Sequence, residues 1–280
     1  MVYLIIGGTM LLIGKGPNKK VNIKRMKSLA AIILTFFFVL GTTGTQTAMG
    51  QSDKTIFVYG NGMEKTFIKY VAELTHKKKP RICFITTASA DHPGVIQYLQ
   101  ELVADIDIKP SYLISFISSS PEQESFEDLI MNSDAIMVGG GNTLNMLGIW
   151  KAQGIDTLLR QAYEKGIILA GGSAGSLCWF NAGYSDSRPK KLTIIECLGF
   201  LNYSHAPHYN DQPERRPLYQ KAVLEGKLSE GYACDAGAGL LFKNGSLAKS
   251  VALDKKNYCY FVSVKDGKLS EQRLRSEIIR

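Results

Sequence analysis

The sequence predicts an α/β fold with a mainly parallel sheet, and three observations support this. From Thr55 onward, short apolar runs rich in Ile, Val and Phe alternate with longer segments of helical periodicity, which is the pattern of successive strand-helix units. The pentapeptide Gly-Gly-Ser-Ala-Gly at 171–175 lies between one such apolar run and a helix-compatible stretch. An apolar fraction of 45% in 280 residues, with charges of both signs, is typical of a globular protein.

The individual elements follow from this alternation. We expect strands at residues 55–59, 81–86, 111–116, 134–138 and 167–170. Between them we expect helices at 63–74, 94–106, 122–131 and 144–165, the last interrupted near Gly154. A short helix at 176–180, a strand at 198–201 and a helix at 214–228 follow, and from Tyr232 the pattern predicts antiparallel strands with turns at 243–246 and 265–268. No repeat or low-complexity linker divides residues 51–280, so we expect one domain there.

Residues 1–50 differ in charge from the rest of the chain. They carry six basic residues and no acidic ones, so they account for most of the formal net charge of +8. In residues 51–280, 27 basic residues face 25 acidic ones, a balance of +2. This near-neutral balance removes the case for nucleic-acid binding through a basic surface.

Residues 1–50, here called the leader, resemble an export signal that begins at an internal methionine. Met26 and Lys27 precede an apolar stretch at 28–40, and small residues near Gly50 suit a cleavage site after that residue. Residues 1–25 are then an overlong gene start, although the apolar run at 2–13 leaves a membrane anchor open. The apolar stretch is shorter than the roughly 20 residues of a spanning helix, which favours cleavage. We therefore expect an exported protein, periplasmic or secreted, with no membrane association after cleavage.

The five cysteines do not form a metal-binding pattern. None is spaced as a C-x-x-C pair, so no metal cluster is indicated. In an exported protein one or two disulfides remain open, but the odd count and the positions inside apolar runs fit buried free thiols equally well. The connectivity cannot be read from the sequence.

Ser173, at the centre of the glycine-rich pentapeptide, is the first candidate for a nucleophile. A G-x-S-x-G sequence between a strand and a helix is typical of a nucleophile elbow, a sharp turn that lifts the serine oxygen out of the sheet. Glycines on both sides make such a crowded backbone conformation sterically accessible. The alternative is a glycine-rich turn whose serine merely caps the next helix.

Two of the four histidines fall in the segment 204–209, which we expect to be a loop because it contains a proline. A serine hydroxyl needs a neighbouring base, and histidine is the side chain whose ordinary pKa suits this task near neutrality. We expect His208 to be the base. For His205 the better interpretation is a histidine that makes ordinary hydrogen bonds.

A second glycine-rich run, at 138–143, ends one predicted strand and begins a helix. If that strand neighbours the elbow, the amides of Gly140 or Gly141 and the amide of Ala174 can form an oxyanion hole. Triple glycine can also cradle a phosphate, but no G-x-x-x-x-G-K-[ST] motif is present and no G-x-G-x-x-G motif follows the first strand. A nucleotide site is therefore a distant alternative.

Three motifs together resemble the peptidase E family of serine peptidases, which includes the α-aspartyl dipeptidases and the cyanophycinases. They are Gly-Gly-Gly-Asn-Thr at 139–143, Gly-Gly-Ser-Ala-Gly-Ser at 171–176, and His-Ala-Pro-His-Tyr at 205–209 with Pro-Glu-Arg-Arg at 213–216. The resemblance implies a three-layer sandwich like that of class I glutamine amidotransferases. It also makes Ser173 the nucleophile and His208 the base, and it assigns the oxyanion hole to the amides of Gly140 and Ala174.

The acid of the triad is where this chain departs from the family pattern. The family tends to carry an acid directly before a glycine after the histidine, often as Asp-Asp-Gly, whereas this chain has Asp-Ala-Gly at 235–237. Successive strand residues face opposite sides, so this displacement by one position matters. Either Asp235 fills the role, or the histidine has no acidic partner, or another carboxylate orients it: Asp186, Glu196 or Asp211. Asp186 also matches an acid that the family carries shortly after the nucleophile.

These residues together predict a serine peptidase that acts on small peptides without a metal or organic cofactor. If the substrate carries an aspartyl side chain, as the resemblance implies, a guanidinium should bind it. The substrate-binding candidates are Asn142, Arg188, Arg215 and Arg216. Two alternative functions remain open: a cyanophycinase-like hydrolase, and a binding protein of the same fold that lost the acid of the triad. An ordinary α/β-hydrolase is disfavoured because only 13 residues separate Ser173 from Asp186.

Overall fold

The computed structural model describes residues 2–6, 9–13 and 53–280. The chain divides into two units, Met1–Gly50 and Gln51–Arg280. In the first unit, β1 (Val2–Ile6) and β2 (Thr9–Ile13) form an antiparallel pair. The expected signal peptide at 26–50 lies outside the described residues. In the part of the chain that the structure describes, no helix has the length and apolar character needed to cross a membrane.

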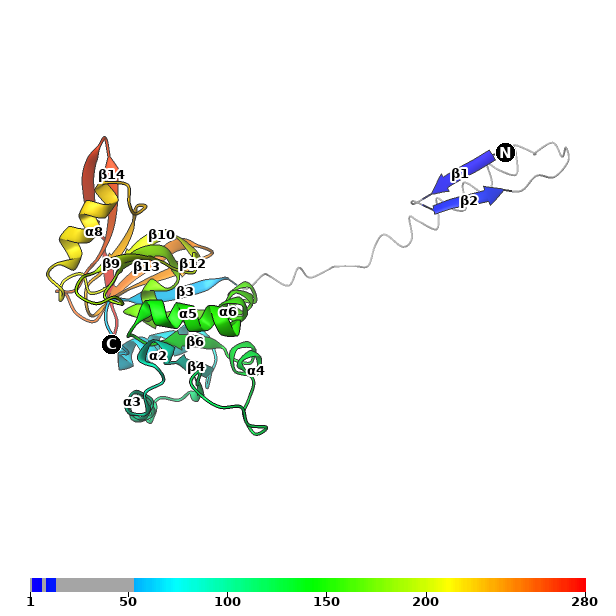
Figure 1. Ribbon diagram of the computed structural model, residues 1–280, viewed down its shortest axis with the longest axis horizontal. Coiled ribbons are helices and arrows are strands. Elements are labelled where there is room, and N and C mark those ends of the chain that lie inside the picture. Colours follow the sequence, from blue (N-terminus) through cyan, green and yellow to red (C-terminus); the bar gives the residue numbers. More distant parts are fainter. Residues whose placement is uncertain (1, 7–8, 14–52) are drawn as a thin grey trace. The chain divides into compact units, whose positions relative to one another are not determined.

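An eight-stranded sheet forms the centre of the second unit (Figure 1). Its strand order is β16-β13-β12-β3-β7-β6-β4-β5, and the five strands from β3 to β5 in this order are mutually parallel. The bounds of these five are β3 (Thr55–Tyr59), β4 (Arg81–Ile85), β5 (Lys109–Leu113), β6 (Ala135–Val138) and β7 (Ile168–Gly172). Strands β12 (Ala238–Lys243), β13 (Ser246–Ala252) and β16 (Ser276–Ile278) extend the sheet beyond β3, with β12 antiparallel to both β3 and β13. The predicted α/β fold with a mainly parallel sheet is confirmed.

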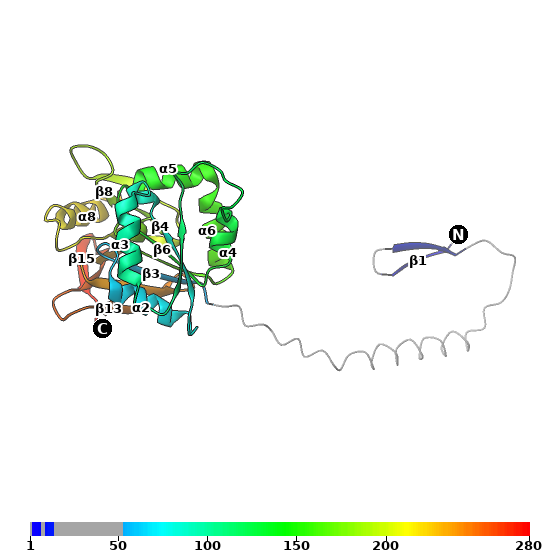
Figure 2. The same cartoon turned by 90° about the horizontal axis from the view of Figure 1, so that it is seen from below.

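Helices cover both faces of this sheet (Figures 1 and 2). In β3, Ile56 and Val58 point into one buried cluster while Phe57 and Tyr59 point into another, because successive strand residues face opposite sides. The cluster of Phe57 includes side chains from α2 (Lys65–Leu74) and α3 (Pro93–Val103). The cluster of Ile56 includes side chains from α4 (Phe126–Met131), α5 (Thr143–Gln153) and α6 (Ile155–Glu164). Both faces are therefore buried, which explains the nearly continuous apolar runs of the parallel strands.

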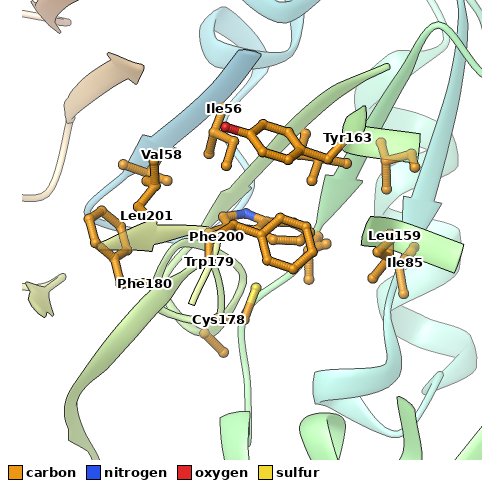
Figure 3. Close-up of a cluster of buried hydrophobic side chains, with 14 of the residues drawn as sticks. Ile56, Val58, Ile85, Leu159, Tyr163, Cys178, Trp179, Phe180, Phe200 and Leu201 are labelled. Carbon is orange, nitrogen blue, oxygen red and sulfur yellow. The ribbon is translucent and has the colours of Figure 1, made fainter. Parts of the chain in front are cut away.

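A second, six-stranded sheet was not expected from the sequence. Its order is β15-β14-β11-β10-β8-β9, and its strands are β8 (Phe180–Ser185), β9 (Thr193–Glu196), β10 (Leu201–Ala206), β11 (Gly231–Cys234), β14 (Cys259–Lys265) and β15 (Lys268–Arg273). Phe180 and Leu201 of this sheet share a buried cluster with Ile56 and Val58 of β3 (Figure 3). On the opposite face, α8 (Arg215–Leu224) packs over Ala206, Ala233 and Val262 in a third cluster. The packing of one sheet against the other buries the inner faces of both.

Several expected boundaries differ from the structure. The long helix predicted at 144–165 is interrupted as expected at Gly154, which has a φ of +73° and ends α5. The helix expected at 176–180 is instead α7 (Ala174–Leu177), and Phe180 already begins β8. The strand expected at 198–201 is wrong, because residues 198–200 lie in a loop and β10 begins at Leu201. The two expected turns join β12 to β13 and β14 to β15.

Candidate active site

Ser173 occupies the sharp bend between β7 and α7. Its φ of 55° and ψ of −117° lie outside the usual regions for a residue with a side chain. Glycine is required beside it, since a Cβ at Gly171 would lie 2.3 Å from the Gly175 carbonyl oxygen. A Cβ at Gly175 would lie 2.1 Å from the Val138 carbonyl oxygen. The serine side chain makes no capping hydrogen bond to α7, so the interpretation of Ser173 as a simple helix cap does not describe this turn.

The carboxyl end of β3 holds the serine and the histidine in place. The Ser173 amide donates to the Tyr59 carbonyl oxygen at 3.3 Å, and the His208 amide donates to the next carbonyl, that of Gly60, at 3.0 Å. Gly60 tolerates no side chain, since a Cβ there would lie 2.2 Å from the Asp235 carbonyl oxygen. Two consecutive peptide groups therefore fix the backbones of two residues that are 35 positions apart in the chain.

The two side chains meet at hydrogen-bonding distance. His208 Nε2 lies 2.8 Å from Ser173 Oγ, and His208 Nδ1 lies 3.0 Å from Asp211 Oδ2. His208 has a φ of 57°, in the left-handed region. The chain turns back at this point, and the Gln212 amide donates to the His208 carbonyl. This turn brings an acid three positions along the chain to the far side of the imidazole.

Asp211 is thus the carboxylate that contacts His208. The sequence left it as one of several alternatives, because its position in a turn gives no periodic signal. Its side chain is 44% exposed, against 18% for the histidine. The pair is consequently open to solvent on the acid's side, which weakens the interaction relative to a fully buried pair.

The expectation that Asp235 orients His208 is not met. Its Oδ2 accepts a hydrogen bond from the Tyr258 amide at 2.9 Å and lies 3.5 Å from the Tyr260 hydroxyl. The carboxylate is therefore directed toward β14, and in residues 53–280 its buried Oδ1 has no hydrogen-bond partner. Burial raises the pKa of this carboxyl group above its ordinary value. This segment contacts the histidine loop through other groups: the Ala236 amide donates to Asn210 Oδ1 at 2.8 Å, and the Tyr209 amide donates to the Cys234 carbonyl at 3.1 Å.

Asp186 does not meet the histidine either. It is exposed at the end of β8, and in residues 53–280 no hydrogen bond joins it to His208. Burial lowers the pKa of the Arg215 guanidinium. The negative charges of Asp186, Asp211 and Glu214 oppose that effect. Glu196, the remaining alternative, is exposed at the end of β9.

The Gly139–Gly141 loop lies against the nucleophile. A Cβ at Gly140 would be 3.2 Å from Ser173 Cβ and 3.5 Å from its Oγ. Within residues 53–280, neither the Gly140 amide nor the Ala174 amide donates to a backbone carbonyl in a turn, loop or cap. Two unpaired amides beside a serine oxygen are the donors that an oxyanion requires.

The predicted substrate-binding side chains are mostly engaged in structural contacts. Asn142 Oδ1 caps α5 by accepting from the Asn145 amide, and its Nδ2 donates to the Ser187 carbonyl. Arg215 is buried and donates to the Tyr184 carbonyl and to Gln212. Arg188 is exposed and donates to Thr193 Oγ1. Arg216 pairs with Glu271 and lies over the rings of Tyr209 and Tyr260.

His205 has a structural environment. It lies in β10 rather than in the expected loop, because the strand continues through Ala206 before Pro207 ends it. The ring is fully buried and stacked on Phe180 with 4.3 Å between centroids. Its Nδ1 lies 3.0 Å from the Tyr232 carbonyl oxygen and its Nε2 lies 3.1 Å from Ser176 Oγ. Burial lowers its pKa to about 3, so this imidazole is neutral near neutrality.

Solved structures support the fold. A crystal structure of a peptidase from an acI-B1 actinobacterium aligns with 82% of this chain and 98% of its own, with a TM-score of 0.63 and 19% identity. A putative peptidase E protein from Listeria monocytogenes EGD-e aligns with 72% of this chain and all of its own, with a TM-score of 0.55 and 21% identity. Both similarities concern the α/β sandwich.

Sequence comparison supports the family. The uncharacterized peptidase YgaJ of Bacillus subtilis is 39% identical over 203 residues, which cover 72% of this chain and 86% of the relative. Peptidase E of Shewanella denitrificans is 27% identical over 151 residues, 51% of this chain and 60% of the relative. The family model described as peptidase family S51 matches residues 56–250, which include Ser173, His208 and Asp211. This chain belongs to peptidase family S51 and is a serine-type peptidase of the peptidase E kind.

Proposed function

We propose that this peptidase hydrolyses short peptides with Ser173 as nucleophile and His208 as general base, and that Asp211 orients the histidine. The observation that carries the proposal is the distance of 2.8 Å between Ser173 Oγ and His208 Nε2. Both residues are anchored through their backbone amides to one strand end, so their separation does not depend on side-chain packing alone. Such preorganisation is what a nucleophile and its base need.

The proposed proton path follows from the hydrogen bonds. Asp211 accepts from the protonated Nδ1 of a neutral imidazole, which leaves the Nε2 lone pair directed at the Ser173 hydroxyl. As Oγ bonds to the peptide carbonyl carbon, its proton passes to Nε2, and the imidazolium then protonates the leaving amine as the C–N bond breaks. Water repeats the sequence on the acyl-serine, which releases the acid and regenerates the enzyme.

The Gly140 and Ala174 amides are proposed to bind the oxyanion of the tetrahedral intermediate. Gly141, the other candidate, has a φ of +136° and lies against the Ala88 carbonyl. Its role in the proposal is to turn the chain so that the Gly140 amide faces the serine. Losing one such donor in other serine hydrolases costs about 10²- to 10³-fold in kcat.

For the substrate, we propose N-terminal aspartyl dipeptides as the first class to test, with Arg216 as the guanidinium that binds the side chain. Arg215 is buried with its donors engaged, and Arg188 is bonded to β9. Arg216 remains 41% exposed, and its position over the ring of Tyr209 places it next to the histidine loop. A substrate carboxylate would have to replace Glu271 as its partner, so the pairing is an exchange rather than the filling of a free site.

Active-site labelling tests the nucleophile and the base. A fluorophosphonate should modify wild-type protein stoichiometrically at Ser173, and His208→Ala should abolish the labelling because the hydroxyl loses its base. The matched control is His76→Asn, which replaces an exposed histidine in the left-handed region by a residue that tolerates that conformation. Absence of labelling in folded wild-type protein would contradict the assignment of Ser173 as the nucleophile.

A substrate screen tests the specificity. Dipeptide amides that differ in their first residue should be hydrolysed by wild-type protein and not by Ser173→Ala. If Arg216 binds an aspartyl side chain, Arg216→Gln should raise KM for the aspartyl substrate, whereas Arg188→Gln should leave it unchanged. Activity that persists in Ser173→Ala would contradict the mechanism, and equal rates on aspartyl and neutral dipeptides would contradict only the substrate class.

We also propose that the protein is exported, with a signal peptide that begins at Met26 and is cleaved after Gly50. The support is the basic start, apolar stretch and small residues of the leader. An intact mass of the protein from a secreting host should correspond to a chain that begins at Gln51. A mass that includes residues 1–50 would contradict cleavage.

A further inference from the structure

Cys234 and Cys259 face each other across two neighbouring strands. Cys234 ends β11, Cys259 begins β14, and the antiparallel register places them directly opposite each other. The Cys234 carbonyl accepts from Tyr209 and the Cys259 carbonyl accepts from Leu274, so both turn away from the partner strand. The neighbouring pair, Asp235 and Tyr258, is joined by a backbone hydrogen bond, since the Asp235 amide donates to the Tyr258 carbonyl.

This arrangement makes the cysteines a non-hydrogen-bonded pair. In such pairs the Cα atoms approach to roughly 4.5 Å and the side chains are closer than in the alternating bonded pairs. A disulfide accepts Cα separations from about 4.4 Å upward. The backbone therefore already has a spacing that a disulfide can bridge.

The side chains are directed at each other. Cys234 Sγ and Cys259 Sγ lie 3.2 Å apart, and both residues are fully buried in the apolar cluster between the two sheets. A disulfide bond length is about 2.05 Å, so a shift of roughly 1.1 Å between the sulfurs would close the bond. A pair of thiols in this setting gains only a weak S–H contact.

We propose that Cys234 and Cys259 form a disulfide that joins β11 to β14. This covalent site is independent of the peptidase mechanism. It connects the strand ends that carry Asp235 and Tyr258, and the segment after Asp235 supports the histidine loop through the Ala236 amide and Asn210. The bond would stop these two strand ends from separating beside the site.

The chemistry requires an oxidant, and we name a low-molecular-weight disulfide such as oxidised glutathione. One cysteine thiolate attacks it, forming a mixed disulfide and releasing one small thiol. The second cysteine thiolate then attacks the protein sulfur of that mixed disulfide, which forms the protein disulfide and releases the second small thiol. The two protein protons leave with the two thiols.

The bond must form before the strands close. A mixed disulfide with a small thiol does not fit in a fully buried apolar cluster, and burial raises the pKa of the Cys234 thiol well above its ordinary value, which removes the reactive thiolate. The cross-link is thus a product of folding under oxidising conditions, as in an exported protein.

Thiol mapping after refolding tests this. The full chain is unfolded with reductant, refolded with or without a mixture of oxidised and reduced glutathione, alkylated in denaturant, digested and analysed by mass spectrometry. The oxidatively refolded protein should contain a peptide pair joined through Cys234 and Cys259 and two fewer alkylated thiols than the reduced protein. Five alkylated cysteines, or a link that bypasses this pair, would overturn the proposal.

Matched variants make the result specific. Cys197→Ser, which changes a half-buried cysteine outside the pair, should retain the cross-link. The double variant Cys234→Ala, Cys259→Ala keeps the cluster apolar and should show no loss of thiols on oxidation. Reductant should lower the midpoint of thermal unfolding of oxidised wild-type protein by roughly 6–12 °C, from the constraint on a loop of this size. It should leave the double variant unchanged, and equal shifts in both proteins would contradict the cross-link.

Discussion

At the scale of single residues, the site depends on two backbones held in uncommon conformations. Ser173 and His208 both have φ values near +55°, and such residues cost on the order of 1–3 kcal/mol each. The hydrogen bonds from their amides to the carbonyls of Tyr59 and Gly60 offset part of this cost. The strain places both side chains on the same side of the strand end, which is the condition for a base to reach its nucleophile.

The proposed orienting role of Asp211 predicts a moderate kinetic effect. Asp211→Asn should lower kcat by about 10- to 100-fold, because an asparagine amide does not hold His208 in the tautomer with a protonated Nδ1 as a carboxylate does. The loss stays moderate because solvent already screens this exposed pair. Glu214→Gln, a neutralisation of an exposed acid in the same segment, should leave kcat unchanged. Steady-state kinetics on the best dipeptide substrate measure both. An unchanged kcat in Asp211→Asn would remove Asp211 from the mechanism.

The buried His205 predicts a pH dependence of stability. Its folded pKa of about 3 lies below the ordinary value of 6.5, so only the unfolded state binds a proton between these values. Stability is fully present above pH 6.5 and is lost as pH falls, by about 1.4 kcal/mol per pH unit from this residue. Urea unfolding at pH 7 and pH 5 should show a smaller loss for His205→Gln than for wild-type protein. Equal losses in the two proteins would contradict this assignment.

At the scale of elements, the Gly139–Gly141 loop is held by the turn that follows β4. The Asn142 amide donates to the Ala88 carbonyl at 2.8 Å, in the short 3-10 helix Thr87–Ser89. Asp91 fixes this turn, because its buried carboxylate accepts from Thr86 Oγ1, from the Ser115 amide and hydroxyl, and from the Phe116 amide. The Gly139–Gly141 loop, which carries a proposed oxyanion donor, is thus positioned by a network that reaches to Ser115 and Phe116 after β5.

This network predicts a large effect at Gly141. A Cβ there would lie 2.2 Å from the Ala88 carbonyl oxygen, at a φ of +136°, so Gly141→Ala must displace the loop. We expect kcat to fall by about 10²- to 10³-fold, as for loss of an oxyanion donor. Gly148→Ala is the matched control: nothing lies within 4 Å of its Cβ position in α5, and it should stabilise the protein by about 0.5–1 kcal/mol with unchanged kcat. Full activity in a folded Gly141→Ala protein would contradict this loop's role.

Asp91 should act on the same loop from a distance. Asp91→Asn removes one acceptor for the Ser115 donors. It should lower kcat by about 10-fold with little change in KM, because in the proposed mechanism the Gly139–Gly141 loop binds the transition-state oxyanion rather than the substrate. Asp128→Asn, at an exposed helix start, serves as the control. Circular dichroism separates misfolding from the kinetic effect, and a change in KM alone would contradict the positioning role.

Sequence alone was sufficient for the elements with strong periodic signals. The strand Thr55–Tyr59 and the break at Gly154 were predicted correctly, because apolar alternation and a helix-ending glycine are local properties. The second sheet was missed because pairings such as β10 with β8, β10 with β11 and β11 with β14 join segments that are separated in the chain, and such pairing leaves no local signal. Sequence could not show that Asp211, rather than Asp235, contacts His208. This contact depends on the turn at His208 and on the direction of the Asp235 carboxylate, and neither leaves a periodic pattern in the sequence.

At the scale of the whole molecule, the candidate site lies where loops that follow strands of the two sheets come together. The eight-stranded sheet supplies the elbow after β7 and the glycine loop after β6, and the six-stranded sheet supplies the histidine loop after β10. The carbonyls at the end of β3 bind both contributions. Parallel strands place their carboxyl ends at one edge, which is where α/β proteins form their sites.

This arrangement predicts that residues 51–280 are sufficient for folding and activity. All three apolar clusters and every residue of the candidate site lie in this unit. A protein that begins at Gln51 should therefore have the same kcat/KM and the same midpoint of thermal unfolding as the full chain. A protein that begins at Gly60 should not fold, because it lacks β3, the central strand whose Tyr59 carbonyl anchors Ser173. If the Gln51 protein unfolds at a markedly lower temperature or loses activity, residues 1–50 contribute to the folded enzyme, and the assignment of the whole site to one unit would be wrong.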